Sequence, residues 1–189
     1  QMYDVPAPKK LDLSSIPALK SLHCRGDRLT ALNLSSSPAL TLLDCRHNQL
    51  TWLDLSSLPA LTVLWCGSNQ LTELDLSSVP ILTKLECSRN RLIELDLSSV
   101  PMLTTLYCPY NQLTELDLSS VPALTVLRCD DNQLTVLDLS LVPELYELSC
   151  RGNQLSELDI RCCLDLKSVL VDPWVVVHRR PDQTVKHPE

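Results

Sequence analysis

The chain has 189 residues, of which 23 are acidic and 16 are basic, and its formal net charge is −7. This charge disfavours a general nucleic-acid binder or a protein that binds acidic membranes, and no apolar run approaches the roughly 18–20 residues of a membrane span. No secretory signal is evident, and the start at Gln1 leaves open that a leader or a larger N-terminal region precedes it.

Residues 1–18 form a lead that contains proline and lysine and ends in a partial repeat unit. A unit of 21 residues then recurs seven times over 19–165, without insertion or deletion, in the frame L-x-x-L-x-C-x-x-N-x-L-x-x-L-x-L-S-x-x-P-x. The fifth copy, 103–123, is LTTLYCPYNQLTELDLSSVPA. A fixed short period predicts stacked units that share one continuous core, and therefore a single solenoid.

Within each copy, the Leu-x-Cys segment alternates as a strand does, with neighbouring side chains on opposite faces. It predicts strands of about 3–4 residues, each parallel to the next and roughly 4.8 Å from it. Proline at position twenty and the Leu-Asp-Leu-Ser segment predict an extended or tightly turned return face with little helix. The predicted fold is a solenoid of short parallel strands with extended or turn-like return segments.

Seven cysteines occupy the sixth position of the frame: Cys24, Cys45, Cys66, Cys87, Cys108, Cys129 and Cys150. They share a strand face with the buried leucines, so we expect small, buried, free thiols. Seven is odd, which prevents complete pairing within the ladder, and even spacing does not supply a metal cluster. Cys162 and Cys163 lie outside the ladder; terminal packing is the simpler expectation, and a redox role stays open.

Asparagine at position nine follows each strand in six copies, and Asp27 takes its place in the first. Asparagine tolerates turn geometry and binds nearby backbone, so its predicted role is structural. Aspartate at position fifteen and glutamate at position thirteen predict acids that point outward on the return side. We expect the aspartates to accept hydrogen bonds from nearby Ser, Thr or backbone groups, with calcium binding as the alternative.

The chain ends in a predicted cap and tail, 166–189. The valine-rich stretch 172–177 predicts one or two closing strands, with Trp174 and its valines covering the end of the core. A ligand-binding role for Trp174 is the alternative. The tail from His178 is charged and contains proline, so we expect it to be loose.

The frame resembles a leucine-rich repeat of the short bacterial kind, whose copies read LxxLxCxxNQLTxLDLS, over about four-fifths of the chain. The resemblance implies a curved solenoid that binds partners on its concave sheet. Similar repeats occur in surface and secreted bacterial proteins and in effectors injected into host cells. A secreted or host-delivered protein is therefore favoured, and the free thiols favour a reducing compartment.

The variable positions of the strand are where a binding function can reside. Trp65 and Tyr107 occupy outward positions in a chain with 4% aromatics, and no core demand explains them. Because Trp, Tyr and Arg are frequent interface hot spots, we predict a protein-binding patch; ordinary surface variation is the alternative. The predicted partner-binding residues are Trp65, Glu86, Tyr107, Tyr110, Arg128, Arg89 and Asp44.

Catalysis has little support in the sequence. Only three glycines are present, no phosphate-binding loop or hydrolase motif occurs, and no cofactor is expected. Cys-x-Asp strings at Cys129 and Cys163 match the nucleophile motif of ubiquitin-ligase effectors, but Cys129 belongs to the core ladder and the helical catalytic domain is absent.

The predicted function is therefore a non-enzymatic, monomeric module for protein–protein interaction. The alternatives are the substrate-recognition region of a larger effector, such as a ubiquitin ligase, and a surface adhesin that binds a glycan through its aromatics.

Overall fold

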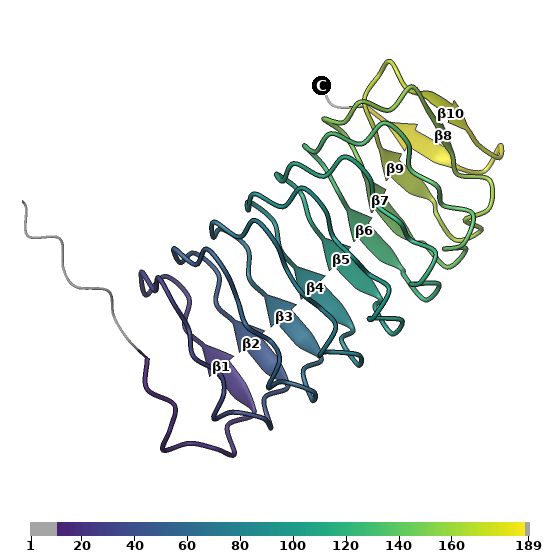
Figure 1. Cartoon of the computed structure of the whole chain (residues 1–189). Helices are drawn as coiled ribbons and strands as arrows, with labels where there is room; N and C mark the ends of the chain where they lie inside the picture. Colours follow the sequence, from purple (N-terminus) through teal and green to yellow (C-terminus); the bar gives the residue numbers. More distant parts are fainter. Residues whose placement is uncertain (1–10, 188–189) are drawn as a thin grey trace, which may run out of the picture.

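The computed structural model describes residues 11–187, which form a stack of coils with strands and no helix (Figure 1). The predicted solenoid of short parallel strands is confirmed. Eleven strands of three residues each are present in the described part: β1 Ser21–His23, β2 Leu42–Asp44, β3 Val63–Trp65, β4 Lys84–Glu86, β5 Thr105–Tyr107, β6 Val126–Arg128, β7 Glu147–Ser149, β8 Glu157–Asp159, β9 Ser168–Leu170, β10 Val176–His178 and β11 Thr184–Lys186.

One parallel sheet of nine strands runs the length of the stack, in the order β1 to β7, then β9 and β11. Each strand takes positions three to five of its copy, and the leucine at position four lies opposite the same leucine of the next copy, as Leu64 lies opposite Leu85. These central leucines are buried, and their neighbours at positions three and five face the other side. The 21-residue period thus fixes the register.

The core lies between the sheet and the return segments and is continuous from Leu13 to Val175. The leucines at positions one, four, eleven, fourteen and sixteen are buried in almost every copy, and all seven ladder cysteines are buried beside them. Burying one leucine side chain contributes roughly 1.5–3 kcal/mol. Because a single coil cannot enclose its own leucines, this stabilisation depends on stacking.

The asparagine ladder ties each coil to its predecessor. Asn69 donates through Nδ2 to the carbonyl oxygens of Cys45 (3.1 Å) and Cys66 (2.9 Å), and its Oδ1 accepts the N–H of Leu50 (3.0 Å). The predicted structural role is confirmed, since the same pattern recurs at Asn48, Asn90, Asn111, Asn132 and Asn153.

A left-handed backbone marks position eight of every copy, just before the asparagine. Gly26 and Gly152 occupy it in the first and last copies, whereas His47, Ser68, Arg89, Tyr110 and Asp131 occupy it elsewhere, with φ between 52° and 57°. An L-residue in this region costs roughly 1–2 kcal/mol. Backbone bonds between coils hold the conformation in place, such as that from the N–H of Tyr110 to the carbonyl of Asp130 (3.0 Å).

The C-terminal end departs from the repeat. β10 pairs with β8 in a separate two-stranded sheet, and β11 pairs with β9 after a coil shorter than 21 residues. Val175 is buried and Val177 packs partly against the core, but Trp174 is 63% exposed, so the prediction that Trp174 covers the core is wrong. The prediction of a loose tail from His178 is also wrong, because β11 lies within that tail.

Candidate partner-binding face

The fifth position of each copy forms one row across the sheet, because the strands are parallel and in register. The row runs through His23, Asp44, Trp65, Glu86, Tyr107, Arg128 and Ser149, and Leu170 of β9 continues it beyond the seventh copy. Adjacent strands lie about 4.8 Å apart, so Trp65 and Tyr107 lie about 10 Å apart with Glu86 between them. Trp65, Glu86 and Tyr107 are half-buried and Arg128 is exposed.

Three arginine–aromatic pairs lie along this part of the molecule. The guanidinium carbon of Arg46 lies 4.7 Å from the ring centre of Trp65, and that of Arg128 lies 5.6 Å from the ring of Tyr107. Arg89 stacks on Tyr110 at 4.3 Å. Each such pair contributes about 0.5–1 kcal/mol at an exposed site and limits the freedom of both side chains.

Arg46 is the functional candidate that sequence reasoning missed. Its Nε lies 2.8 Å from Asp44 Oδ1 and its Nη2 lies 2.7 Å from Asp44 Oδ2, a bidentate pair. The hydrogen bond from Arg46 is the main reason that the pKa of Asp44 lies below its ordinary value. Asp44, a predicted partner-binding residue, is only 4% exposed, so it fixes Arg46 in its place above Trp65.

Glu86 is held by backbone N–H groups of the preceding coil and of its own coil. Its carboxylate accepts the N–H groups of Gly67 (3.2 Å) and Ser88 (3.0 Å), and also the hydroxyl of Ser88. A Cβ atom at position 67 would collide with this carboxylate, so the glycine makes room for it. The result is an oriented negative charge between the two aromatic rings.

At its C-terminal end the face opens into a hollow of about 500 Å³, whose lining includes Arg128, Tyr146 and Leu170. Arg128 is fixed there by Glu147, with Nε and Nη2 at 2.7 and 2.5 Å from Glu147 Oε1. The face therefore carries aromatic rings, an oriented carboxylate and paired guanidinium groups.

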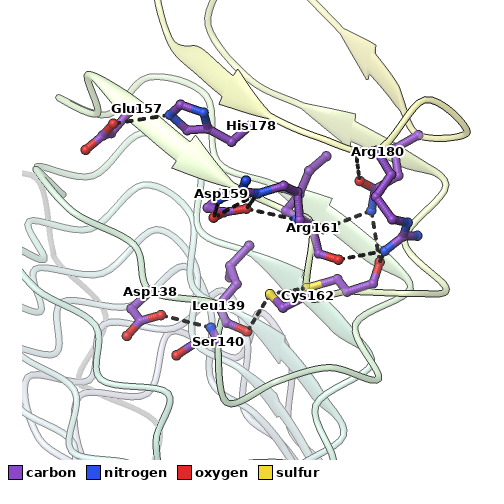
Figure 2. Close-up of polar contacts among 12 residues, drawn as sticks. Asp138, Leu139, Ser140, Glu157, Asp159, Arg161, Cys162, His178 and Arg180 are labelled. Carbon is purple, nitrogen blue, oxygen red and sulfur yellow. Dashed lines mark hydrogen bonds and ion pairs between the residues drawn. The ribbon is translucent and has the colours of Figure 1, made fainter.

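The return side carries the aspartate ladder. Asp54 Oδ1 accepts the N–H of Ser56 at 2.9 Å, and Figure 2 shows the equivalent bond between Asp138 and Ser140. These hydrogen bonds lower the pKa of the aspartates, as at Asp54 and Asp138, and the predicted local hydrogen-bonding role is confirmed. Within 11–187, no group of three or more His, Cys, Asp or Glu side chains could hold a metal ion.

The cysteine ladder consists of free thiols, as predicted. Burial raises the pKa of Cys108 to about 12, and the pKa of Cys129 lies well above its ordinary value. A buried thiol of raised pKa is a poor nucleophile. Cys129 is fully buried in the core, so its Cys-x-Asp string does not present a reactive thiol.

The sequence model of the family "Leucine Rich repeats (2 copies)" matches residues 38–78. The functional domain of InlJ from Listeria monocytogenes, described as including a cysteine ladder, is 31% identical and superposes with a TM-score of 0.69 over 95% of this chain and 48% of that one. The chain has the fold of a leucine-rich-repeat solenoid. No curated protein sequence matched it.

Two further solved structures share this fold. A leucine-rich-repeat protein of Leptospira interrogans has a TM-score of 0.85 and 21% identity, over 94% of this chain and 52% of that one. YopM from Yersinia enterocolitica has a TM-score of 0.78 and 28% identity, over 92% and 38%. The chain thus spans about half the length of the Listeria and Leptospira proteins.

Leucine-rich-repeat proteins of this kind are typically non-enzymatic modules that bind other proteins. Within the described residues, no helix is long and apolar enough to cross a membrane.

Proposed function

We propose that this protein binds a protein partner on its concave face, through Trp65, Glu86, Tyr107 and Arg128, with Arg89 and Tyr110 beside them. The observation that carries the proposal is the set of three arginine–aromatic stacks. Core packing does not require aromatic rings at these outward positions. Trp, Tyr and Arg are also the residues that most often dominate interface energies.

Preorganisation supports the same proposal. Asp44 holds Arg46, Glu147 holds Arg128, and two backbone N–H groups hold Glu86. Side chains that are already ordered lose less conformational entropy when a partner binds, which leaves more of the contact energy as affinity. In this arrangement Asp44 acts through Arg46, whereas Trp65 and Tyr107 contact the partner directly.

The experiment uses a partner captured by the immobilised wild-type protein and then purified. Calorimetry measures its dissociation constant for the wild type and for the Trp65→Ala/Tyr107→Ala variant. Hot-spot truncations typically cost 2 kcal/mol or more, so we expect affinity to fall at least about 30-fold. Trp52→Ala is the matched control, because Trp52 is 52% exposed and lies outside the strands of the sheet.

We expect the control to bind as the wild type does. Equal affinity of the double variant and the wild type would contradict the proposal, as would a loss confined to Trp52→Ala.

A further inference from the structure

Two adjacent cysteines occupy the turn that closes the seventh copy. Cys162 is the one partly exposed cysteine of the nine, all of which lie in the described part of the chain, and Cys163 is fully buried. Their Sγ atoms lie 3.6 Å apart. Figure 2 shows Cys162 beside the carbonyl of Leu139, which accepts its thiol at 3.3 Å. The protein-binding face makes no use of this pair.

We propose that Cys162 and Cys163 form a site of reversible thiol–disulfide exchange with a small-molecule disulfide such as oxidised glutathione. The thiolate of Cys162 attacks one sulfur of the disulfide, the sulfur–sulfur bond breaks, and one glutathione thiolate leaves. Cys163 then attacks the sulfur of Cys162 and gives its proton to the second glutathione, which leaves as a thiol. The two protein thiols are oxidised to a vicinal disulfide, and one glutathione disulfide is reduced to two thiols.

Exposure assigns the two roles. A small disulfide can approach Cys162, whereas Cys163 lies in the core with its Sγ 3.7 Å from the carbonyl of Val142. Burial raises the pKa of Cys163 to about 12, which favours Cys162 as the first nucleophile. Once Cys162 carries glutathione, Cys163 is the nearest thiol and needs no diffusion to reach it.

The product would be a strained and therefore easily reduced disulfide. Adjacent Cα atoms lie about 3.8 Å apart across a trans peptide bond, whereas disulfides usually join Cα atoms at least about 4.4 Å apart. Strained disulfides have more oxidising potentials, which is typical of labile and regulatory bonds. The reaction should therefore reverse with an ordinary thiol reductant.

The turn also anchors the C-terminal end of the solenoid. The side chain of Gln183, which is 2% exposed, donates to the carbonyl oxygens of Ile160 and Cys163, both at 2.9 Å. Arg180 donates to the carbonyls of Arg161 (2.7 Å) and Leu164 (2.9 Å). Formation of the Cys162–Cys163 disulfide must distort this turn. It should therefore weaken the hydrogen bonds from Gln183 and Arg180 that position β11.

The repeat itself supplies matched variants. Serine occupies the place of Cys162 in copies such as 103–123, and valine occupies the place of Cys163 in four copies. Native protein is incubated with oxidised glutathione, and its intact mass is followed. We expect wild type to lose two hydrogen masses without retaining glutathione, Cys163→Val to retain one glutathione, and Cys162→Ser to stay unmodified.

Three outcomes would overturn the proposal: a lasting glutathione adduct on wild type, equal modification of Cys162→Ser, or adducts on the ladder cysteines. Hydrogen–deuterium exchange then tests the anchor. The amides of Thr184–Lys186 should exchange severalfold faster in oxidised wild type and return to their starting rate after reduction. Identical exchange in oxidised and reduced wild type would contradict the coupling to β11.

Discussion

Ser37 occupies the nineteenth position of the first copy, where the later copies carry leucine, valine or cysteine. It is fully buried, and its Oγ is the one buried side-chain oxygen or nitrogen in 11–187 without a hydrogen-bond partner. A buried polar group without a partner destabilises a protein by about 1–3 kcal/mol. The first coil therefore carries a local defect in the core.

We expect Ser37→Val to raise the free energy of unfolding by about 1–2 kcal/mol, because it removes the unpaired hydroxyl and adds buried apolar surface. Urea denaturation measures the change. Ser35→Val, at an exposed position of the same turn, is the control and should shift stability by less than about 0.5 kcal/mol. A destabilised Ser37→Val variant would show that this site cannot accommodate valine.

At the scale of single residues, the sequence predicts whether a side chain points into the core wherever its position in the repeat frame is clear. The frame distinguishes the buried cysteines from Trp65 and Tyr107, because positions with the same residue in every copy build the core and positions that vary between copies face outward. It could not identify Arg46, since the stack on Trp65 joins different positions of two copies. It also could not show that Asp44 is buried and forms a bidentate pair with Arg46, because other copies carry different residues at these positions.

At the scale of the element, the asparagine ladder determines how one coil is attached to the next. Asn111 donates to the carbonyls of Cys87 and Cys108, both at 3.1 Å, and accepts the N–H of Leu92 at 3.0 Å. Its side chain links two consecutive coils in the middle of the stack. Solvent cannot readily replace these bonds, because Asn111 is 8% exposed.

Asn111→Ala should lower the free energy of unfolding by about 2–5 kcal/mol, because it leaves several buried backbone groups without partners. Guanidinium denaturation gives the value, and circular dichroism checks that the strands persist. The neighbouring Gln112→Ala removes an exposed side chain and should be nearly neutral. Similar stabilities for the two variants would contradict the structural role of the ladder.

Strands and turns were predictable because the period of the leucines is fixed. The hydrogen bonds between coils that support them were not predictable. Threonine at position two forms a second ladder, in which Thr62 Oγ1 donates to the carbonyl of Thr41 at 3.0 Å. The left-handed conformation at position eight was also hidden, because residues as different as Tyr110 and Asp131 adopt it. In both cases the neighbouring coil determines the conformation, and a single copy carries no signal of it.

At the scale of the whole molecule, the seven ladder thiols link folding to alkaline pH. Burial raises the pKa of Cys24 to about 11 and that of Cys150 to about 12, whereas an exposed thiol titrates near pH 9. The folded state therefore keeps protons that the unfolded state releases. The stabilisation is complete below about pH 9 and is lost as the pH rises towards the folded-state values.

We expect the free energy of unfolding to fall steeply above about pH 9, with each ladder thiol contributing up to about 1.4 kcal/mol per pH unit. Denaturation at a series of pH values between neutrality and mild alkali measures the slope. A Cys108→Ala/Cys129→Ala variant should be less stable at neutral pH but show a shallower slope. An unchanged slope would mean that these thiols do not control the alkaline transition.

The overall architecture was predictable because a repeat without insertions leaves one way to stack. The structure of the C-terminal end was not predictable, because β10 and β11 lie where the repeat frame breaks down and no repeated position indicates their structure. The partner is likewise not encoded in the frame, because a binding surface consists of the residues that differ between copies.

The most direct test of the binding face is radical footprinting of the purified complex. The three tryptophans serve as internal reporters: Trp65 lies on the sheet face, whereas Trp52 and Trp174 are exposed at 52% and 63% outside the strands. We predict that the bound partner slows oxidation of Trp65 and Tyr107 and leaves the oxidation of Trp52 and Trp174 unchanged. Protection of Trp52 or Trp174, with Trp65 as reactive as in the free protein, would contradict it.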